Sequence, residues 1–215
     1  MRFLNASASD WAVALQTERV VMLGLVHRAL RSFLRDMHSD SLWQQVARDC
    51  GLGPEPFEAL LPYDDALCYA ILSAASTRLQ RPEAAILEDF GQWLVTAQTG
   101  LPLRRLLRFG GRSFTDFLWS LEELPDRARL ALPLVRLPEV RLSETEGGTF
   151  RLTCAPPFAF APILKGVIDV MADDYGALIL SETCPDPSGG GEIRLRLHLA
   201  DFARGQRFDL AGDAP

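Results

Sequence analysis

The stretch that decides the fold runs from Ser113 to Pro138 and reads SFTDFLWSLEELPDRARLALPLVRLP. Its first half places apolar side chains three or four residues apart, which is the spacing of one buried helix face. These side chains are Phe114, Phe117, Leu118, Leu121 and Leu124. Ser113 precedes the first turn and Asp116 follows three residues later, so the pair is typical of a capping box. We therefore expect a helix from about residue 114, followed by a proline-rich crossing.

Pro125 decides how this helix ends. A proline inside a helix removes one hydrogen bond and costs about 3 kcal/mol, whereas in the first turn of a new helix it costs little. We expect the first helix to end at Leu124 and a second one, PDRARLAL, to begin at Pro125. The alternative is one continuous helix with a kink at the proline.

The composition bounds the class of protein. The chain has 215 residues, of which 48% are hydrophobic and 23% are charged, as in ordinary soluble globular domains. A formal net charge of −6 and a pI near 5.1 argue against nucleic-acid binding, which needs a basic face. No apolar run reaches the ~18 residues of a membrane span. The N-terminus lacks the apolar core of a secretory signal. We expect a cytoplasmic protein that binds neither nucleic acid nor membrane.

Patterns for catalysis or metal binding are weak. The cysteines follow no metal-binding rhythm, and we expect four free thiols. They are Cys50, Cys68, Cys154 and Cys184. No serine or cysteine stands in a nucleophile motif such as GxSxG, so the sequence does not indicate an enzyme. Asp64 and Asp65 could act as paired acids, but their place at a predicted helix start favours capping.

A small basic cluster precedes the organising helix. It consists of Arg104, Arg105, Arg108 and Arg112. Such a cluster could dock an acidic partner or a ligand carboxylate, whereas a solvated helix face is the simpler interpretation.

The apolar period changes along the chain. From Met22 to Met37 one face is apolar at helical spacing, and further helices follow up to Gly111. Beyond Pro138 the period becomes two, which is typical of strands. The predicted elements there are a hairpin over 140–154, a helix over 163–175, and strands over 177–182 and 193–199. The fold class is therefore α+β, with a helical N-terminal part and an antiparallel sheet of about four strands with packed helices.

This order of elements, with these residues, resembles the H-NOX family of heme–nitric oxide/oxygen binding domains, the sensor fold also found in soluble guanylate cyclase. The resemblance covers the chain from Met22 to about Leu199. The motifs that carry it are MLGLVHRAL (22–30), YDDALCYAILSAAS (63–76), LEDFGQWLV (87–95) and LRFGGRSFTDFLWSLEELPDRARLALP (107–133).

The resemblance implies a domain at 22–200, with 22–112 as its helical distal part and 113–200 as the proximal helix and sheet. Residues 1–21 are then an N-terminal appendage, for which the alternative interpretation is a true translation start at Met22. Residues 201–215 are a C-terminal tail.

The resemblance also implies a heme pocket. Val26 would border its distal side, Trp93 and Leu121 would line it, and Pro138 would lie against the heme face. Family members bind the heme iron through a histidine on the proximal helix, and Pro125 occupies that position here. A proline offers iron no lone pair, whereas an imidazole nitrogen is the usual proximal ligand.

A second family motif concerns the heme propionates. Members hold them with Tyr-x-Ser-x-Arg at the end of the second strand, where this chain has Thr153, Ala155 and Pro157. An arginine pairs with a carboxylate through two hydrogen bonds, which proline cannot do.

Other side chains are candidates for a substituted iron ligand. The thiols Cys68 and Cys154 are two, since a thiolate can bind heme iron. His27 stands one step off the apolar face of the first helix, so we expect it at the surface or at a boundary. We expect His38, in a polar turn, and His198, on the outer side of a strand, to be solvated.

By resemblance we expect a regulatory sensor, not an enzyme, that acts on a signalling partner of the cyclase or kinase type. Two hypotheses stay open. One is a heme-based sensor of NO or O2 with a substituted axial ligand. The other is a heme-free descendant that is an interaction module or a receptor for a small apolar molecule or gas.

Overall fold

The computed structural model describes residues 21–53, 55–131, 137–145, 147–157, 159–185 and 189–199. The predicted tail lies outside these residues, as does the predicted appendage except for Val21. Packing divides the chain into two compact units, Met1–Ala75 and Ser76–Pro215. The boundary between these units differs from the predicted division after residue 112, and the predicted outer limits of 22 and 200 stay predictions.

The first unit contains β1 (Val21–Leu23), α2 (Gly24–Met37), α3 (Asp40–Asp49), β2 (Pro62–Asp64) and the start of α4 (Ala66–Leu79). The helices of the second unit are α5 (Glu83–Thr96), α6 (Leu101–Arg108), α7 (Phe114–Ser120), α8 (Leu124–Ala131) and α9 (Phe160–Tyr175), with 3-10 turns η1 (Gln98–Gly100) and η2 (Leu121–Glu123). Its strands are β3 (Val140–Thr145), β4 (Thr149–Cys154), β5 (Leu178–Pro185) and β6 (Gly191–Leu199). The predicted α+β class is confirmed.

In the first unit, a short strand pair modifies the predicted first helix. The helix was expected from Met22, but it begins at Gly24 because β1 pairs antiparallel with β2. Gly24 is required at this point, since a Cβ there would overlap the carbonyl oxygen of Glu58. Asp64 ends β2 and its Oδ1 accepts a hydrogen bond from the Ala66 amide at 3.0 Å, so the predicted role of Asp64 at a helix start is confirmed.

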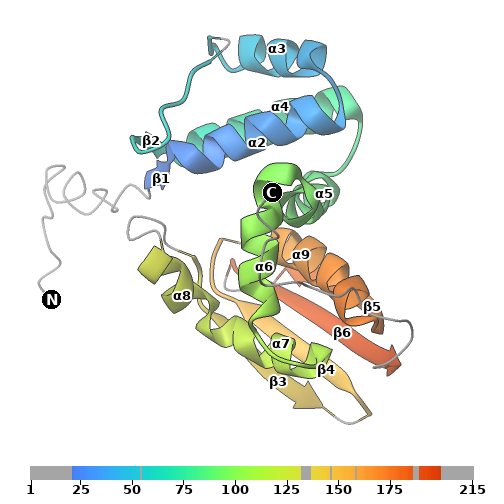
Figure 1. The fold of residues 1–215 in the computed structure, drawn as a ribbon. Helices are drawn as coiled ribbons and strands as arrows, with labels where there is room; N and C mark the ends of the chain where they lie inside the picture. Colours follow the sequence, from blue (N-terminus) through green and yellow to red (C-terminus); the bar gives the residue numbers. More distant parts are fainter. Residues whose placement is uncertain are drawn as a thin grey trace, which may run out of the picture. The chain divides into compact units, whose positions relative to one another are not determined.

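The sheet of the second unit has the order β3-β4-β6-β5, with every neighbouring pair antiparallel (Figure 1). One face is apolar and carries α9, whose residues join the same buried cluster. The sheet residues of that cluster are Val140, Leu142, Phe150, Leu152, Cys154, Ile193 and Leu195. These residues alternate along their strands, which is the period-two pattern that the sequence shows.

The helices α5 and α9 cross at unusually close range. The crossing places a glycine on each helix: a Cβ on Gly91 would overlap the Ile163 carbonyl, and a Cβ on Gly166 would overlap the Glu88 carbonyl. Both obstacles are backbone atoms, which cannot move aside as a side chain can. The two glycines therefore set the distance between α5 and the helix that covers the sheet.

No helix in the described ranges combines the length and apolar content needed to span a membrane.

The crossing predicts the effect of one methyl group. Gly166→Ala should lower the free energy of unfolding by about 1–3 kcal/mol, because the added Cβ forces α5 and α9 apart. Gly53→Ala is the control, since Gly53 has an ordinary φ and open space around it, and its effect should stay within about 0.5 kcal/mol. Urea denaturation followed by circular dichroism measures both, and equal stabilities would contradict the close crossing.

Candidate functional site

The segment that the resemblance assigns to iron binding is built as two helices and a turn. The capping box at the start of α7 is present: Ser113 Oγ accepts from the Asp116 amide at 3.1 Å, and Asp116 Oδ2 accepts from the Ser113 amide at 3.0 Å. These hydrogen bonds lower the pKa of the Asp116 carboxyl. Phe114, Phe117 and Leu118 are buried as the spacing predicted, which confirms the apolar face of this helix.

Pro125 lies in the first turn of a new helix, as the sequence predicted, but the preceding helix ends at Ser120 and not at the predicted Leu124. The helix ends at Ser120, the turn η2 follows, and α8 begins at Leu124 with Pro125 in its first turn. The continuous, kinked helix is therefore wrong. Pro125 is buried, as is Leu121 in the turn. The missing amide of the proline falls where a helix has no intrahelical partner for it, so the break costs little.

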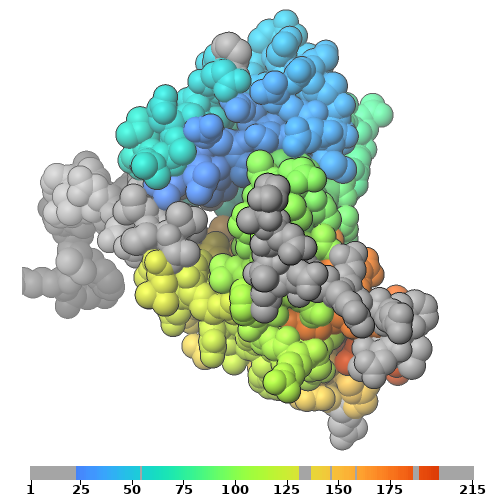
Figure 2. Space-filling model, viewed as in Figure 1, coloured from blue at the N-terminus to red at the C-terminus, as the bar shows by residue number. Residues whose placement is uncertain are grey.

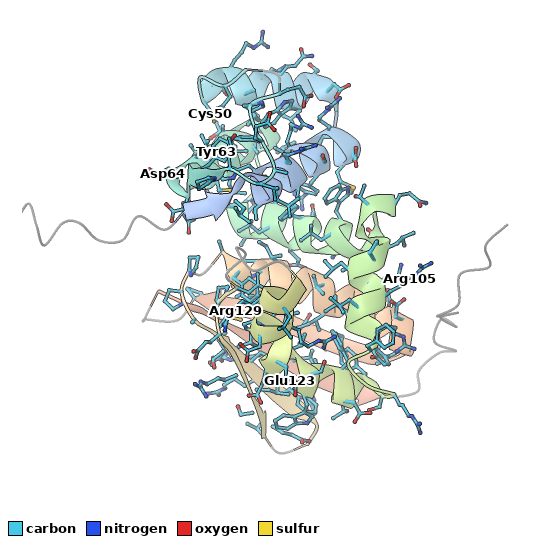
Figure 3. The ribbon with its side chains drawn as sticks, turned by 60° about the vertical axis from the view of Figure 1, so that its left-hand side comes forward. Cys50, Tyr63, Asp64, Arg105, Glu123 and Arg129 are labelled. Carbon is cyan, nitrogen blue, oxygen red and sulfur yellow. The ribbon has the colours of Figure 1, made fainter. Side chains whose placement is uncertain are left out.

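The turn η2 is fixed to the sheet. Glu122 Oε1 accepts a hydrogen bond from the Leu142 amide on the edge strand β3 at 2.8 Å. In α8, the Arg127 guanidinium donates from Nη2 to the Leu106 carbonyl of α6 at 2.8 Å. Figure 3 shows Glu123 and Arg129 on this same segment, and the segment reaches the molecular surface in Figure 2. The position of Pro125 is thus held by hydrogen bonds on both of its sides.

The three positions of the second motif carry no cationic side chain. Thr153 Oγ1 lies 3.5 Å from the Arg141 carbonyl, and the Ala155 amide donates to the Glu139 carbonyl at 2.9 Å. Pro157 is exposed. The three positions therefore offer one hydroxyl, one methyl and one pyrrolidine ring, so they supply no positive charge to a carboxylate.

Two further predicted pocket residues lie in the second unit. Trp93 on α5 is buried and stacks on Phe90, with 6.1 Å between the ring centroids. Pro138 is half-buried in the residues that lead into β3. These placements agree with a core aromatic and with a partly covered loop, and whether the residues line a pocket stays a prediction.

The basic cluster is mostly a structural feature. Arg104 forms a two-pronged ion pair with Asp174 of α9, whose side chain is 0% exposed; Arg104 Nε donates to Asp174 Oδ2 at 2.7 Å. This pairing raises the pKa of Arg104. The Arg108 guanidinium lies 3.6 Å from the ring centroid of Tyr175. Arg105 and Arg112 are exposed, and Figure 3 shows Arg105 extending away from α6. The solvated-face interpretation thus holds for Arg105 and Arg112, while Arg104 and Arg108 fix α6 to α9.

A polar network between α5, α9 and β5 was not predicted. Lys165 Nζ contacts Glu88 and lies 2.8 Å from Asp169 Oδ2, while Ser181 Oγ donates to Asp169 Oδ1 at 2.6 Å. Burial alone would lower the pKa of Lys165, but the hydrogen bonds to Asp169 and Glu88 outweigh it and raise that pKa. The one available sequence signal was the spacing of Lys165 and Asp169, which puts them on one helix face.

The prediction for His27 is wrong. His27 is 0% exposed, and its ring packs against Phe57 and Tyr63, at centroid distances of 4.9 and 5.4 Å. Its Nδ1 lies 3.4 Å from the Leu23 carbonyl, and its Nε2 has no hydrogen-bond partner among the described residues. The periodicity of one helix does not reveal that the 55–64 segment covers a second side of it. Val26, the neighbouring pocket prediction, is half-buried on α2.

The other candidate ligands are poorly placed for iron. His38 and His198 are exposed, as predicted. Burial raises the pKa of the Cys154 thiol to about 12, and burial together with the Asp65 charge raises that of Cys68 to about 12. Neither sulfur is therefore a thiolate near neutral pH. Among the described residues, no three His, Cys, Asp or Glu side chains gather as a metal site.

The overall match to a known family is now clear. A family model described as haem-NO-binding (HNOB) matches residues 23–180. The chain belongs to the haem-NO-binding family. Soluble guanylate cyclase 89Da of Drosophila melanogaster is 23% identical over 181 residues, which make up 81% of this chain and 27% of that protein.

Solved structures of the family share the fold. A variant of the T. tengcongensis H-NOX superposes with a TM-score of 0.68 at 15% identity, covering 83% of this chain and 99% of that one. A variant of the S. oneidensis H-NOX in the Fe(II) ligation state superposes with a TM-score of 0.67 at 16% identity, covering 83% and 97%. The predicted H-NOX fold is confirmed. The curated cyclases are longer proteins, and the matched regions span 17% to 27% of their lengths.

The buried ion pair predicts a large effect of one substitution. Arg104→Met should lower the free energy of unfolding by about 3–5 kcal/mol, because it leaves the carboxylate of Asp174 buried without its guanidinium. Arg105→Met removes an exposed arginine one residue away and should change stability by no more than about 0.5 kcal/mol. Chemical denaturation of both variants measures the difference. Equal effects would show that the Arg104–Asp174 pair does not hold α6.

The burial of His27 predicts a pH dependence. Burial lowers the pKa of this imidazole below its ordinary 6.5, and the backbone of Leu23 and Asp64 offsets only part of that effect. Below pH 6.5 the imidazole of His27 therefore binds a proton in the unfolded chain more readily than in the folded chain. The free energy of unfolding is highest above this pH and falls as the pH drops.

A comparison of variants isolates this contribution. From about pH 7 to pH 5, the free energy of unfolding should fall less in His27→Gln than in the wild type. His38→Gln, which changes an exposed histidine, should follow the wild type. Identical pH profiles for the wild type and His27→Gln would contradict the burial of a neutral His27.

Proposed function

We propose that this chain is a heme-free member of the haem-NO-binding family that serves as a regulatory domain for a signalling protein. One observation carries the proposal. At the position where the resemblance places the iron ligand, the chain has a buried proline in the first turn of a new helix. A proline nitrogen within a peptide bond has no lone pair to give to iron, and no conformational change can supply one.

The second fixing point supports the same proposal. Heme carries two carboxylates that a binding site must neutralise or solvate, and arginine does this best. The positions of Thr153, Ala155 and Pro157 hold no charged group. The residues present thus fit heme neither at its iron nor at its propionates.

None of the three candidate substitute ligands, His27, Cys68 and Cys154, is well placed to repair this. The ring of His27 is enclosed by Phe57 and Tyr63 within the first unit, and the thiols of Cys68 and Cys154 hold their protons at neutral pH. Each of these groups would have to leave its packing or lose a tightly held proton to bind a metal. The heme-based sensor with a substituted ligand is therefore the weaker hypothesis.

The relatives support a regulatory role. They are guanylate cyclases that contain the matched region as a minor part of their length. We infer that this chain acts in the cytoplasm on a partner of the cyclase or kinase type and has no catalytic activity of its own. Its ligand, if it takes one, is a small apolar molecule or gas rather than a metal complex.

A hemin titration of the full 215-residue chain tests the proposal. The wild type should give no Soret band that saturates at one heme per chain and shifts with nitric oxide. Pro125→His places an imidazole at this position. Pro125→Ala is its control, since alanine also removes the proline ring but provides no group that can bind iron.

Each outcome of this titration decides a point. A saturable, nitric-oxide-sensitive band in the wild type would overturn the proposal. Heme binding by Pro125→His alone would show that only the ligand was lost. Silence in all three proteins would show that the pocket itself no longer accepts a porphyrin, which also supports a heme-free protein.

A further inference from the structure

We propose that the open face of the sheet in the second unit is a docking surface for an acidic segment of a partner protein. The inference rests on the proposed function, because it names the surface through which a regulatory domain without a cofactor would contact its partner. We call this surface the arginine face. Its residues are Arg141, Ser143, Thr145, Thr149, Arg151, Thr153, Leu180, Glu182, Cys184, Glu192, Arg194 and Arg196.

The strand register brings the arginines of this face together. Arg151 on β4 lies directly opposite Arg194 on β6, and Arg196 follows two residues later on the same side of β6. On β3, Ser143 is opposite Arg151, and Arg141 precedes it by two residues. Directly opposed side chains in an antiparallel sheet project from the same face, so the four guanidinium groups share one surface.

This face is open, unlike the other side of the sheet. The side chains of Arg141, Arg151 and Arg194 are 77%, 51% and 52% exposed, and Arg196 is exposed as well. The opposite face is buried under α9 and the rest of the apolar cluster. Each arginine therefore presents its guanidinium outwards from a rigid, hydrogen-bonded sheet.

The carboxylates within the face do not saturate it. Glu192 serves two arginines at once, with its Oε1 at 2.6 Å from Arg194 Nε and 3.7 Å from Arg151 Nε, and Glu182 lies 3.7 Å from Arg194. Arg196 forms no ion pair with the residues that the structure describes. A guanidinium has five N–H donors, so these bonds leave many donors for a partner's carboxylates.

Two like charges directly opposite each other in a sheet are destabilising, and Arg151 and Arg194 are such a pair. Ion pairs within the face offset the repulsion between Arg151 and Arg194, because Glu192 contacts both and Glu182 lies directly opposite Arg194, but no described carboxylate does this for Arg196. A solvated sheet face is satisfied by any polar side chain, so nothing in the fold requires arginine there.

The charge of the face selects the class of partner. The face holds four arginines and two glutamates, and Glu139 pairs with Arg141 at its edge at 3.3 Å, so the face keeps a net positive charge, whereas the whole chain carries a net charge of −6. A nucleic acid extends beyond such a small patch and would meet the acidic remainder of the surface. A short acidic segment of a protein can contact the arginine face without touching the acidic surface around it, so charge complementarity favours such a segment.

Binding of a defined acidic polymer tests the proposal. Fluorescently labelled poly-L-glutamate of about 20 residues, at low salt, should bind the full chain even though its net charge is negative, and the affinity should fall steeply with added salt. The triple variant R151E/R194E/R196E should bind at least about tenfold more weakly than the control R48E/R105E/R112E. Both variants carry the same net charge, and all six arginines are exposed, so both should fold.

Several results would overturn the proposal. These are no binding of poly-L-glutamate at low salt, an equal loss in both triple variants, or tighter binding of duplex DNA than of poly-L-glutamate. A wild-type dimer that R151E/R194E/R196E dissociates would instead make the face a contact between copies of this chain. None of these results depends on heme. The hemin titration can therefore contradict the proposed function, and this measurement the docking surface, independently of each other.

Discussion

The close crossing of α5 and α9 is the constraint on which the second unit depends. Gly91 and Gly166 let the two helix backbones approach until a methyl group on either would meet a carbonyl oxygen. With α9 held in this way, its other side covers the apolar face of the sheet. At the end of α9, Asp174 and Tyr175 contact the arginines of α6. The proximal segment is then fixed between α6 and the edge strand β3.

This scheme of contacts explains how the fold can persist without iron. Among the described residues, hydrogen bonds and apolar contacts between protein groups hold the proximal segment. In a heme protein of this family, by resemblance, a bond from iron to the same segment would add to them. By the same resemblance Pro125 stands at the position of the ligand, and a proline is compatible with the chain direction there because η2 already turns the backbone before α8 begins. The fold and the cofactor site are therefore separable, since different residues determine them.

Much of the fold could be predicted because its signals are local. The capping box at Ser113 and Asp116, the break before Pro125 and the alternation of the hairpin all depend on residues within a few positions of each other. The features that escaped prediction join distant parts of the chain. Arg104 and Asp174 are 70 residues apart, and His27 is buried by Phe57, which no helical periodicity indicates.

In the candidate site, too, local features could be predicted, whereas contacts between distant parts of the chain could not. That Pro125 stands where a ligand is expected came from the resemblance to the family, and its first-turn position was predicted from the sequence, whereas its burial required the structure. The role of Arg104 and Arg108 inside the unit, rather than on a docking surface, was also invisible, because their partners come from a helix far along the chain. The arginine face was hidden for a similar reason, since the register of three strands assembles it.

The central claim is that this chain keeps the haem-NO-binding fold while lacking what holds heme. The most direct test is the amount of heme per chain in the 215-residue protein purified from cells grown with a heme precursor, measured as the pyridine hemochrome. We expect a heme content far below one per chain, together with a folded protein by circular dichroism. A content close to one heme per chain would contradict it.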